Sequence, residues 1–270
     1  MKMRLIVAAV LVPLILVMIL VAPTILTAIV LGVLCAIAAF ELMAGTGLSK
    51  NLRLVCYTGA MAFFIPMWCH FGMPHIWMVL ALSIFTMLLF SELLISKGRF
   101  RLERLSVCFI AGLLIPYMLS ALVRLMNHDI GRLLIMIPLV VAFLADSGAY
   151  FIGKFFGRHK LSPTISPNKT IEGAVGGIFT AILAMLIFCL VLDLSVDVTV
   201  NYALAITYGI IGSLASIFGD LCFSAIKRQT GIKDYGNLLP GHGGILDRCD
   251  SLFIVAPIIE ILMAFLPVVE

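Results

Sequence analysis

The chain has 270 residues, of which 63% are hydrophobic and only 12% are charged, with a net charge of +4. Soluble domains average about a quarter charged residues, so this composition leaves too few charges to cover a water-facing surface and excludes a soluble protein. The seven cysteines are scattered singly without a CxxC pair, and they indicate neither a disulfide framework nor a thiolate zinc site.

Apolar segments follow one another along the whole chain, each close to the ~20 residues that cross a bilayer. Residues 5–40 carry no charge, a run too long for a signal-peptide core, and they fit two retained helices separated at Pro23. We predict an all-α, polytopic membrane bundle of about nine transmembrane helices, over residues 5–21, 24–44, 54–70, 75–95, 105–125, 133–153, 172–194, 202–226 and 251–268.

Small residues recur in these helices at spacings that let helix backbones approach closely in lipid, as in Gly173 with Gly177.

The basic residues lie mainly on one side of the predicted bundle. Only Arg124 and Arg132, of eighteen Lys and Arg residues, fall on the other side. Because cytoplasmic loops are enriched in Lys and Arg, we predict a cytoplasmic N-terminus and an outside C-terminus.

Two acidic residues lie inside predicted spans, where a charge is costly and usually faces the bundle interior or a wet cavity. Asp146 shares a helix face with Tyr150 and Lys154 at four-residue steps. Asp220 shares a face with Ser224, and two basic residues continue that face beyond it. Each acid also has a plainer interpretation, as a buried ion pair that settles helix packing.

A second pair of acids, Asp247 and Asp250, is three residues apart at the start of the last predicted helix. With Asp146 and Asp220 they bring four carboxylates to one membrane interface, beside two loops that hold eight basic residues. Carboxylates that gather hard cations, surrounded by Lys and Arg, are what metal-assisted phosphoryl chemistry needs. The helix start at residues 168–170 offers backbone N–H groups to a further phosphate.

Other features carry less weight. Glu41 and Glu92 lie near cytoplasmic helix ends, and we interpret them as interfacial charges. Glu260 lies deep in the last helix, where pairing with a polar neighbour and lining a pathway both stay open. The sequence has no GxxxxGK[ST], HExxH or GxSxG motif, which argues against an ATPase motor or a zincin protease.

The polar stretch near the C-terminus forms a longer pattern. Residues 224–228 read SAIKR and residues 233–250 read KDYGNLLPGHGGILDRCD. This stretch closely resembles the signature of the phosphatidate cytidylyltransferases (CDP-diacylglycerol synthases). Residues 146–150 (DSGAY) and 166–172 (SPNKTIE) also resemble that family. Cys249 departs from the family pattern, which has an aliphatic residue or Thr there.

The resemblance implies a membrane enzyme that converts CTP and phosphatidic acid into CDP-diacylglycerol and pyrophosphate with Mg²⁺. It implies that Asp220 and Asp247 are metal ligands, and that Asp250 and Asp146 complete that site or order it. The phosphate contacts implied are Lys227, Arg228, Lys233 and Arg248. The nucleotide or pyrophosphate contacts expected are Asn168, Lys169, Ser224, His242, Gly243 and Gly244. His242 and the glycines also have a plainer interpretation. His242 would then only shape the loop, and the glycines would only form a turn.

Further expectations stand beside the resemblance. We expect a single membrane-embedded domain over 1–270, in which 1–130 form the scaffold and dimer helices and 131–270 carry the catalytic helices and loops. The resemblance implies a homodimer. The compact chain without a soluble extension indicates a bacterial inner membrane, and the distribution of Lys and Arg places the active site on the cytoplasmic side. We expect no nucleic-acid partner. Whether a second cation in the site is Mg²⁺ or a monovalent ion such as K⁺ stays open.

Three alternatives remain at this level. An anion transporter also needs intramembrane acids and a basic mouth, but the polar motifs crowd into the second half of the chain, whereas transporters often show two related halves. A related CTP-using transferase acting on an isoprenoid lipid phosphate has the same polar motif. A passive lipid scaffold has no need for four carboxylates. The acyl preference, the residues that read cytosine and the oligomeric state stay open.

Overall fold

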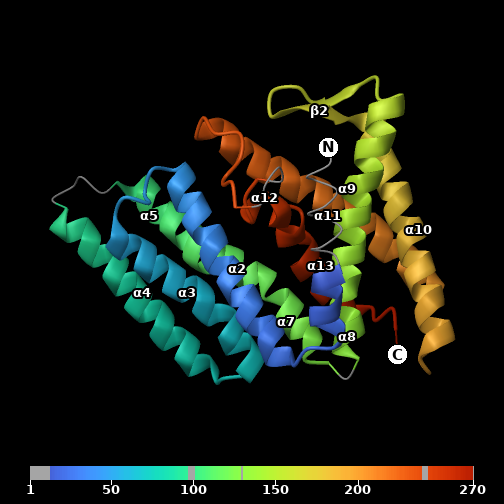
Figure 1. Ribbon diagram of the computed structural model, residues 1–270, viewed down its shortest axis with the longest axis horizontal. Coiled ribbons are helices and arrows are strands. Elements are labelled where there is room, and N and C mark those ends of the chain that lie inside the picture. The colour runs from blue at the N-terminus through green and yellow to red at the C-terminus, as the bar shows by residue number, and fades with distance from the viewer. Residues whose placement is uncertain (1–12, 97–100, 129, 239–242, 270) are drawn as a thin grey trace. The chain divides into compact units, whose positions relative to one another are not determined.

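The computed structural model describes residues 13–96, 101–128, 130–238 and 243–269, which form two compact units (Figure 1). Unit 1 comprises Met1–Arg132 with Thr230–Cys249, and unit 2 comprises Leu133–Gln229 with Asp250–Glu270. The described chain is overwhelmingly helical, with a single two-stranded sheet among the residues described. The prediction of an all-α membrane protein is confirmed.

Seven described segments are long and apolar enough to cross a membrane, and each overlaps a predicted span. They are Thr24–Gly45, Leu52–Phe71, His75–Ile95, Leu102–Met126, Gly131–Phe156, Ile171–Ser195 and Tyr202–Gln229. Residues 5–12 of the first predicted span, 5–21, lie outside the described residues, and residues 13–20 are helical. The ninth corresponds to α13 (Leu252–Phe265), whose 14 residues are fewer than the ~20 of a full crossing. The number nine and the orientation of the termini therefore stay predictions.

Unit 1 is built on α2 (Thr24–Gly45), α3 (Leu52–Phe71) and α4 (His75–Ile95), which lie side by side in Figure 1. Its fourth span consists of α5 (Leu102–Phe109), a π-helical turn η1 (Ile110–Leu114), α6 (Ile115–Leu119) and α7 (Ala121–Met126). The wide turn comes just before Pro116, which has no N–H for the helical ladder and whose ring crowds the preceding turn. A short α12 (Leu246–Cys249) completes the unit and contacts α2.

Unit 2 begins at Leu133, within the short helix α8 (Gly131–Leu134), and contains α9 (Met136–Phe156), α10 (Ile171–Ser195), α11 (Tyr202–Gln229) and α13. Glycines allow α9 and α10 to run in close contact (Figure 1). A Cβ on Gly173 would lie 2.7 Å from the carbonyl oxygen of Ala149, and one on Gly177 would lie 2.8 Å from that of Ala145. Real Cβ atoms essentially never come so near, so the predicted close approach at these glycines is confirmed.

The loop predicted after the sixth span contains a short hairpin. Strands β1 (Lys160–Ser162) and β2 (Ser166–Thr170) pair antiparallel, and β2 leads directly into α10. Thr170 is the N-cap of α10, and its hydroxyl accepts a hydrogen bond from the Gly173 N–H at 3.1 Å. The hairpin thereby holds Lys169 one residue before a rigid helix cap.

Large apolar side chains cover the outward faces of both units. Met87 of α4 is 73% exposed and Phe179 of α10 is 66% exposed. Such surfaces are unfavourable in water but match the hydrocarbon of a bilayer, where only hydrogen-bonded backbone structures such as these helices are stable. The chain is an integral membrane protein.

Candidate active site

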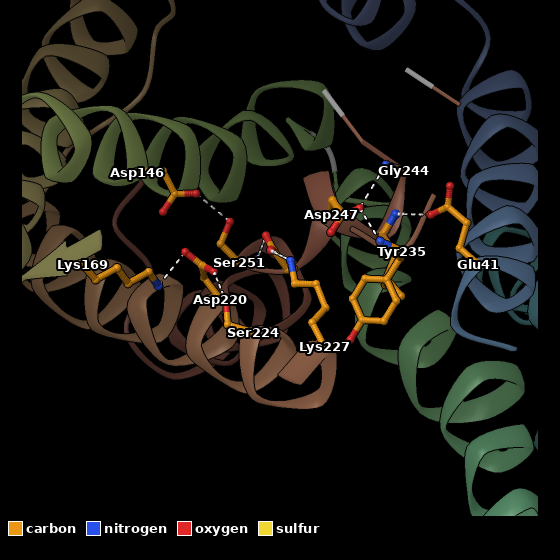
Figure 2. Close-up of polar contacts among 12 residues, drawn as sticks. Glu41, Asp146, Lys169, Asp220, Ser224, Lys227, Tyr235, Gly244, Asp247 and Ser251 are labelled. Carbon is orange, nitrogen blue, oxygen red and sulfur yellow. Dashed lines mark hydrogen bonds and ion pairs between the residues drawn. The ribbon is translucent and has the colours of Figure 1, made fainter. Parts of the chain in front are cut away.

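In unit 2, an acidic residue of α11 meets a lysine of the hairpin. The Nζ atom of Lys169 lies 2.5 Å from Oδ2 of Asp220, and the hydroxyl of Ser224 donates to Oδ1 at 3.2 Å (Figure 2). The side chains of Asp220 and Lys169 are 28% and 24% exposed, so the pair is largely removed from water. The predicted common face of Asp220 and Ser224 is confirmed by their hydrogen bond, which joins residues one helical turn apart.

Asp250 lies in the segment just before α13 and is buried. Its Oδ1 accepts the Ser251 N–H at 2.9 Å, and its Oδ2 lies 4.0 Å from Nζ of Lys227. Burial, together with the nearby carboxylates of Asp220 and Asp146, raises the pKa of Asp250 to about 7, while Lys227 acts in the opposite direction. Because its charged form is disfavoured in these surroundings, the carboxylate of Asp250 would be stabilised by any further positive charge placed near it.

Asp146 of α9 uses both carboxylate oxygens within unit 2. Oδ1 accepts a hydrogen bond from the Ser216 hydroxyl at 2.8 Å. Oδ2 accepts one from the Ser251 hydroxyl at 2.9 Å, the contact drawn in Figure 2. These bonds join α9 to α11 and to the residue before α13. Asp146 is therefore a link between three segments, which fits the ordering role among the two roles that the sequence predicted for it.

The basic residues of unit 2 fall into two groups. Lys169 and Lys227 face the carboxylates, and the Lys227 side chain is only 11% exposed. Arg228 is exposed, and its Nε donates to the carbonyl oxygen of Ile165 at 3.1 Å, so it lies against the hairpin. Lys154 lies over the ring of Tyr150, whose side chain is turned outward and 62% exposed.

The start of α10 was predicted to offer N–H groups to a phosphate. The helix begins at Ile171, and Thr170 already accepts one of its first N–H groups. Glu172 places a carboxylate in the first turn, where it accepts the backbone N–H groups of Arg158 and His159. A negative charge at this point opposes a bound anion, so of the groups at this end of the helix Lys169 is the one that favours an anion. Asn168 is exposed beside it.

In unit 1, Asp247 lies in α12 and is buried. Its Oδ2 accepts two backbone N–H groups, from Tyr235 at 2.8 Å and from Gly244 at 3.0 Å (Figure 2). Gly243 has φ +83°, a conformation that glycine adopts at little cost, in agreement with the turn predicted for these glycines. The Gly244 N–H is used inside the turn, by Asp247.

The remaining predicted contacts lie around this turn. Lys233 and Arg248 belong to unit 1 and are exposed, and Arg248 has a further interaction within the described chain. His242 lies outside the described residues, as do residues 239–241.

The carboxylates suit a hard cation by donor type. Carboxylate oxygens are the ligands that Mg²⁺ prefers. Among the described residues, however, no three His, Cys, Asp or Glu side chains are arranged to hold a metal ion. In this arrangement Lys169 and Lys227 supply the positive charge near Asp220 and Asp250.

Sequence reasoning missed three side chains that organise these carboxylates. Ser216 and Ser251 donate to Asp146, and hydroxyl groups at these positions have no local pattern that marks them. Glu41 was interpreted as an interfacial charge, but it is buried and bonded to the segment that carries Asp247. Its position inside an otherwise apolar span was the available signal.

Comparisons with known proteins give one consistent result. The chain matches the model of the cytidylyltransferase family over residues 2–266. It is 35% identical over 237 residues to the phosphatidate cytidylyltransferase of Bacillus subtilis (strain 168), with 85% of each chain covered. It is 34% identical over 213 residues to the phosphatidate cytidylyltransferase of Staphylococcus aureus (strain COL), with 78% of each chain covered. A shorter match, to the Staphylococcus epidermidis protein of the same name, has 44% identity over 133 residues and covers 49% of this chain and 50% of the relative.

Proposed function

The chain belongs to the cytidylyltransferase family, and from that membership we propose that it transfers the cytidylyl group of CTP to phosphatidic acid, giving CDP-diacylglycerol and pyrophosphate for phospholipid synthesis. The observation that carries this function is the family match over residues 2–266, which includes every carboxylate and lysine of the candidate site. The B. subtilis and S. aureus relatives, which cover most of this chain, bear the name of that activity.

The reaction needs charge neutralisation more than proton transfer. A phosphate oxygen of phosphatidic acid forms a bond to the α-phosphorus of CTP, and the bond from that phosphorus to the oxygen bridging the α- and β-phosphates breaks. The electron pair of that bond leaves with pyrophosphate. The attacking oxygen is already ionised at neutral pH, so no strong general base is required. Catalysis then rests on alignment of two anions and on positive charge around the transferred group.

Two lysines have the placement for this task. Lys169 lies on a rigid hairpin next to the α10 cap, and Lys227 lies on α11, so neither depends on a long flexible loop. Their ammonium groups now face Asp220 and Asp250. When the phosphates of CTP enter, the lysines contact these phosphates and keep the carboxylates as second partners. Arg228, exposed beside the hairpin, extends the same positive surface.

A divalent cation is part of the proposal. Asp220, Asp247 and Asp250 would hold it, with Asp146 as the residue that orders Asp250 through Ser251. When bound, Mg²⁺ supplies positive charge to the phosphate oxygens and to the leaving pyrophosphate. A second cation such as K⁺ belongs to the same proposal.

The membrane setting gives the two substrates separate routes. Most of the Lys and Arg residues are predicted on one side, so we place the active site at the cytoplasmic face of a bacterial plasma membrane. There CTP arrives from water, while the acyl chains of phosphatidic acid stay in the bilayer. We also propose a homodimer, in which the helices of residues 1–130 supply the contacts.

The test is CTP-dependent release of pyrophosphate by the purified protein in detergent, with phosphatidic acid and Mg²⁺ each present or omitted. We expect release only when all three components are present. We expect Asp220→Asn to lose at least about a hundredfold in rate, because it removes a charge that Lys169 contacts and that would hold the cation.

Two results would change the proposal. Release with another lipid phosphate, such as an isoprenoid phosphate, but none with phosphatidic acid would keep the chemistry and replace the lipid. No release with any lipid phosphate, from protein with intact helical circular dichroism, would refute the transferase.

A further inference from the structure

One buried acid of unit 1 has no part in the chemistry proposed above. Glu41 lies in α2, little more than one turn before the helix ends at Gly45, and it is 5% exposed. A carboxylate in an apolar helix is costly unless it has strong partners. The partners of Glu41 therefore indicate what the residue is for.

These partners come from the other end of the chain. Oε1 accepts the Ile245 N–H at 3.0 Å, and Oε2 accepts the Leu246 N–H at 2.8 Å. Both donors lie where α12 begins, and Figure 2 shows Glu41 pointing at this segment. One carboxylate thus fixes two consecutive peptide groups directly before Asp247.

Two glycines of the same segment are shaped around this carboxylate. A Cβ added to Gly236 or to Gly244 would lie 2.4 Å from Oε1 of Glu41. Any larger residue would displace the acid, so the backbone contacts Glu41 at two points besides the two hydrogen bonds. The fit leaves the carboxylate little freedom.

Asp247 holds the same turn from its other side. Its Oδ2 accepts the N–H groups of Gly244 and Tyr235, so Gly244 touches Glu41 through its Cα and Asp247 through its N–H. Movement of this turn away from Glu41 therefore also shifts the acceptor position of Asp247. The two acids share one small piece of backbone.

We propose that Glu41 is a positioning residue that sets the Asp247 carboxylate for cytidylyl transfer. The inference rests on the proposed function for its catalytic consequence, but its structural half concerns unit 1 alone. Glu41 acts through the backbone of Ile245 and Leu246, and it contacts neither substrate. It replaces the interfacial role that the sequence predicted for this residue.

Glu41→Gln is the informative change. Glutamine has nearly the same volume, but its amide nitrogen is a donor and meets a backbone N–H that is also a donor. One hydrogen bond to a charged acceptor is lost and one donor stays buried without a partner. We expect kcat to fall about tenfold to a hundredfold, the KM for phosphatidic acid to change less than about twofold, and the half-saturating Mg²⁺ concentration to rise.

Glu92→Gln is the matched control. Glu92 is also 5% exposed and also belongs to a span of unit 1, but its Oε1 pairs with Arg53 of α3 at 3.2 Å. We expect this variant to keep kcat within about threefold of the unchanged protein, since the pair is exposed on the Arg53 side. Equal losses of kcat in both variants would overturn a specific role for Glu41.

Amide hydrogen exchange tests the positioning without any activity. The N–H groups of Tyr235 and Gly244 donate to Asp247, not to Glu41, so they report on the turn itself. We expect their exchange to quicken at least about tenfold in Glu41→Gln and to stay unchanged in Glu92→Gln. Unchanged exchange in Glu41→Gln would overturn the inference even if the protein proves to be a transferase. Quickened exchange in a protein that shows no transferase activity would uphold the structural half and reject the function.

A double-mutant cycle completes the test. If Glu41 acts through Asp247, adding Glu41→Gln to Asp247→Asn lowers the residual rate by less than about twofold. A full, independent loss in that background would show that Glu41 acts elsewhere.

Discussion

Replacing Asp146 separates a cation ligand from a residue that joins helices. Its two oxygens accept hydroxyl groups of Ser216 and Ser251 at 2.8 and 2.9 Å. Asp146→Ala removes both acceptors. A hydrogen bond to a charged group contributes about 1.5–3 kcal/mol, and we take the lower value because hydrogen bonds between helices in membranes are comparatively weak. Two such bonds give a loss of about 3 kcal/mol in the free energy of unfolding. This corresponds to a fall of about 6–12 °C in the unfolding midpoint.

Asp146→Asn removes the charge but keeps the contacts. A serine hydroxyl either donates or accepts, so Ser216 and Ser251 still bond both ends of an amide. We expect this variant to lose less than about 1 kcal/mol in stability and less than about tenfold in pyrophosphate release, with an unchanged Mg²⁺ requirement. Thermal unfolding in detergent and Mg²⁺ titrations of the rate measure both. If Asn and Ala are equally inactive and the Asn variant needs much more Mg²⁺, the ordering role is refuted and Asp146 is a cation ligand.

Three further outcomes are expected. Lys169→Ala should lower kcat/KM for CTP at least about a hundredfold, with Lys169→Arg partly active, which steady-state kinetics will measure. With divalent cations removed by a chelator, the raised pKa of Asp250 means that the folded state holds its proton more tightly than the unfolded state does. The temperature at the unfolding midpoint should therefore fall as pH rises from about 4 to about 7, and this dependence should be absent in Asp250→Asn. Gly173→Ala should destabilise by about 1–3 kcal/mol in thermal unfolding, whereas Gly59→Ala, with open space around its Cβ, should not.

The spans were predictable because their signal is local. A helix in lipid needs ~20 apolar residues, and the predicted span 75–95 coincides with α4 (His75–Ile95). The hairpin over residues 160–170 was predicted only as a loop, because three- and five-residue strands carry too few side chains to show an alternating pattern.

The site was predictable only where one helix carries both partners. Asp220 and Ser224 are four residues apart on α11, and helical geometry alone brings them together. Arg228, on the same predicted face, instead bonds the carbonyl of Ile165, a partner that depends on the hairpin. The contacts of Asp146 and Glu41 join separate segments, and a single sequence gives no pattern for such pairs.

The distance along the chain between Glu41 and its partners bears on biosynthesis. Ile245 is 204 residues downstream. At the usual ~5–20 residues per second, the ribosome needs about 10–40 s to reach it after Glu41 has been made. During that interval α2 carries an acid without the peptide groups that later bind it. Unit 1 therefore cannot form all of its contacts until its second segment, Thr230–Cys249, has been synthesised near the end of translation. In a nascent chain stalled before Thr230, the helices of Met1–Arg132 lack that segment.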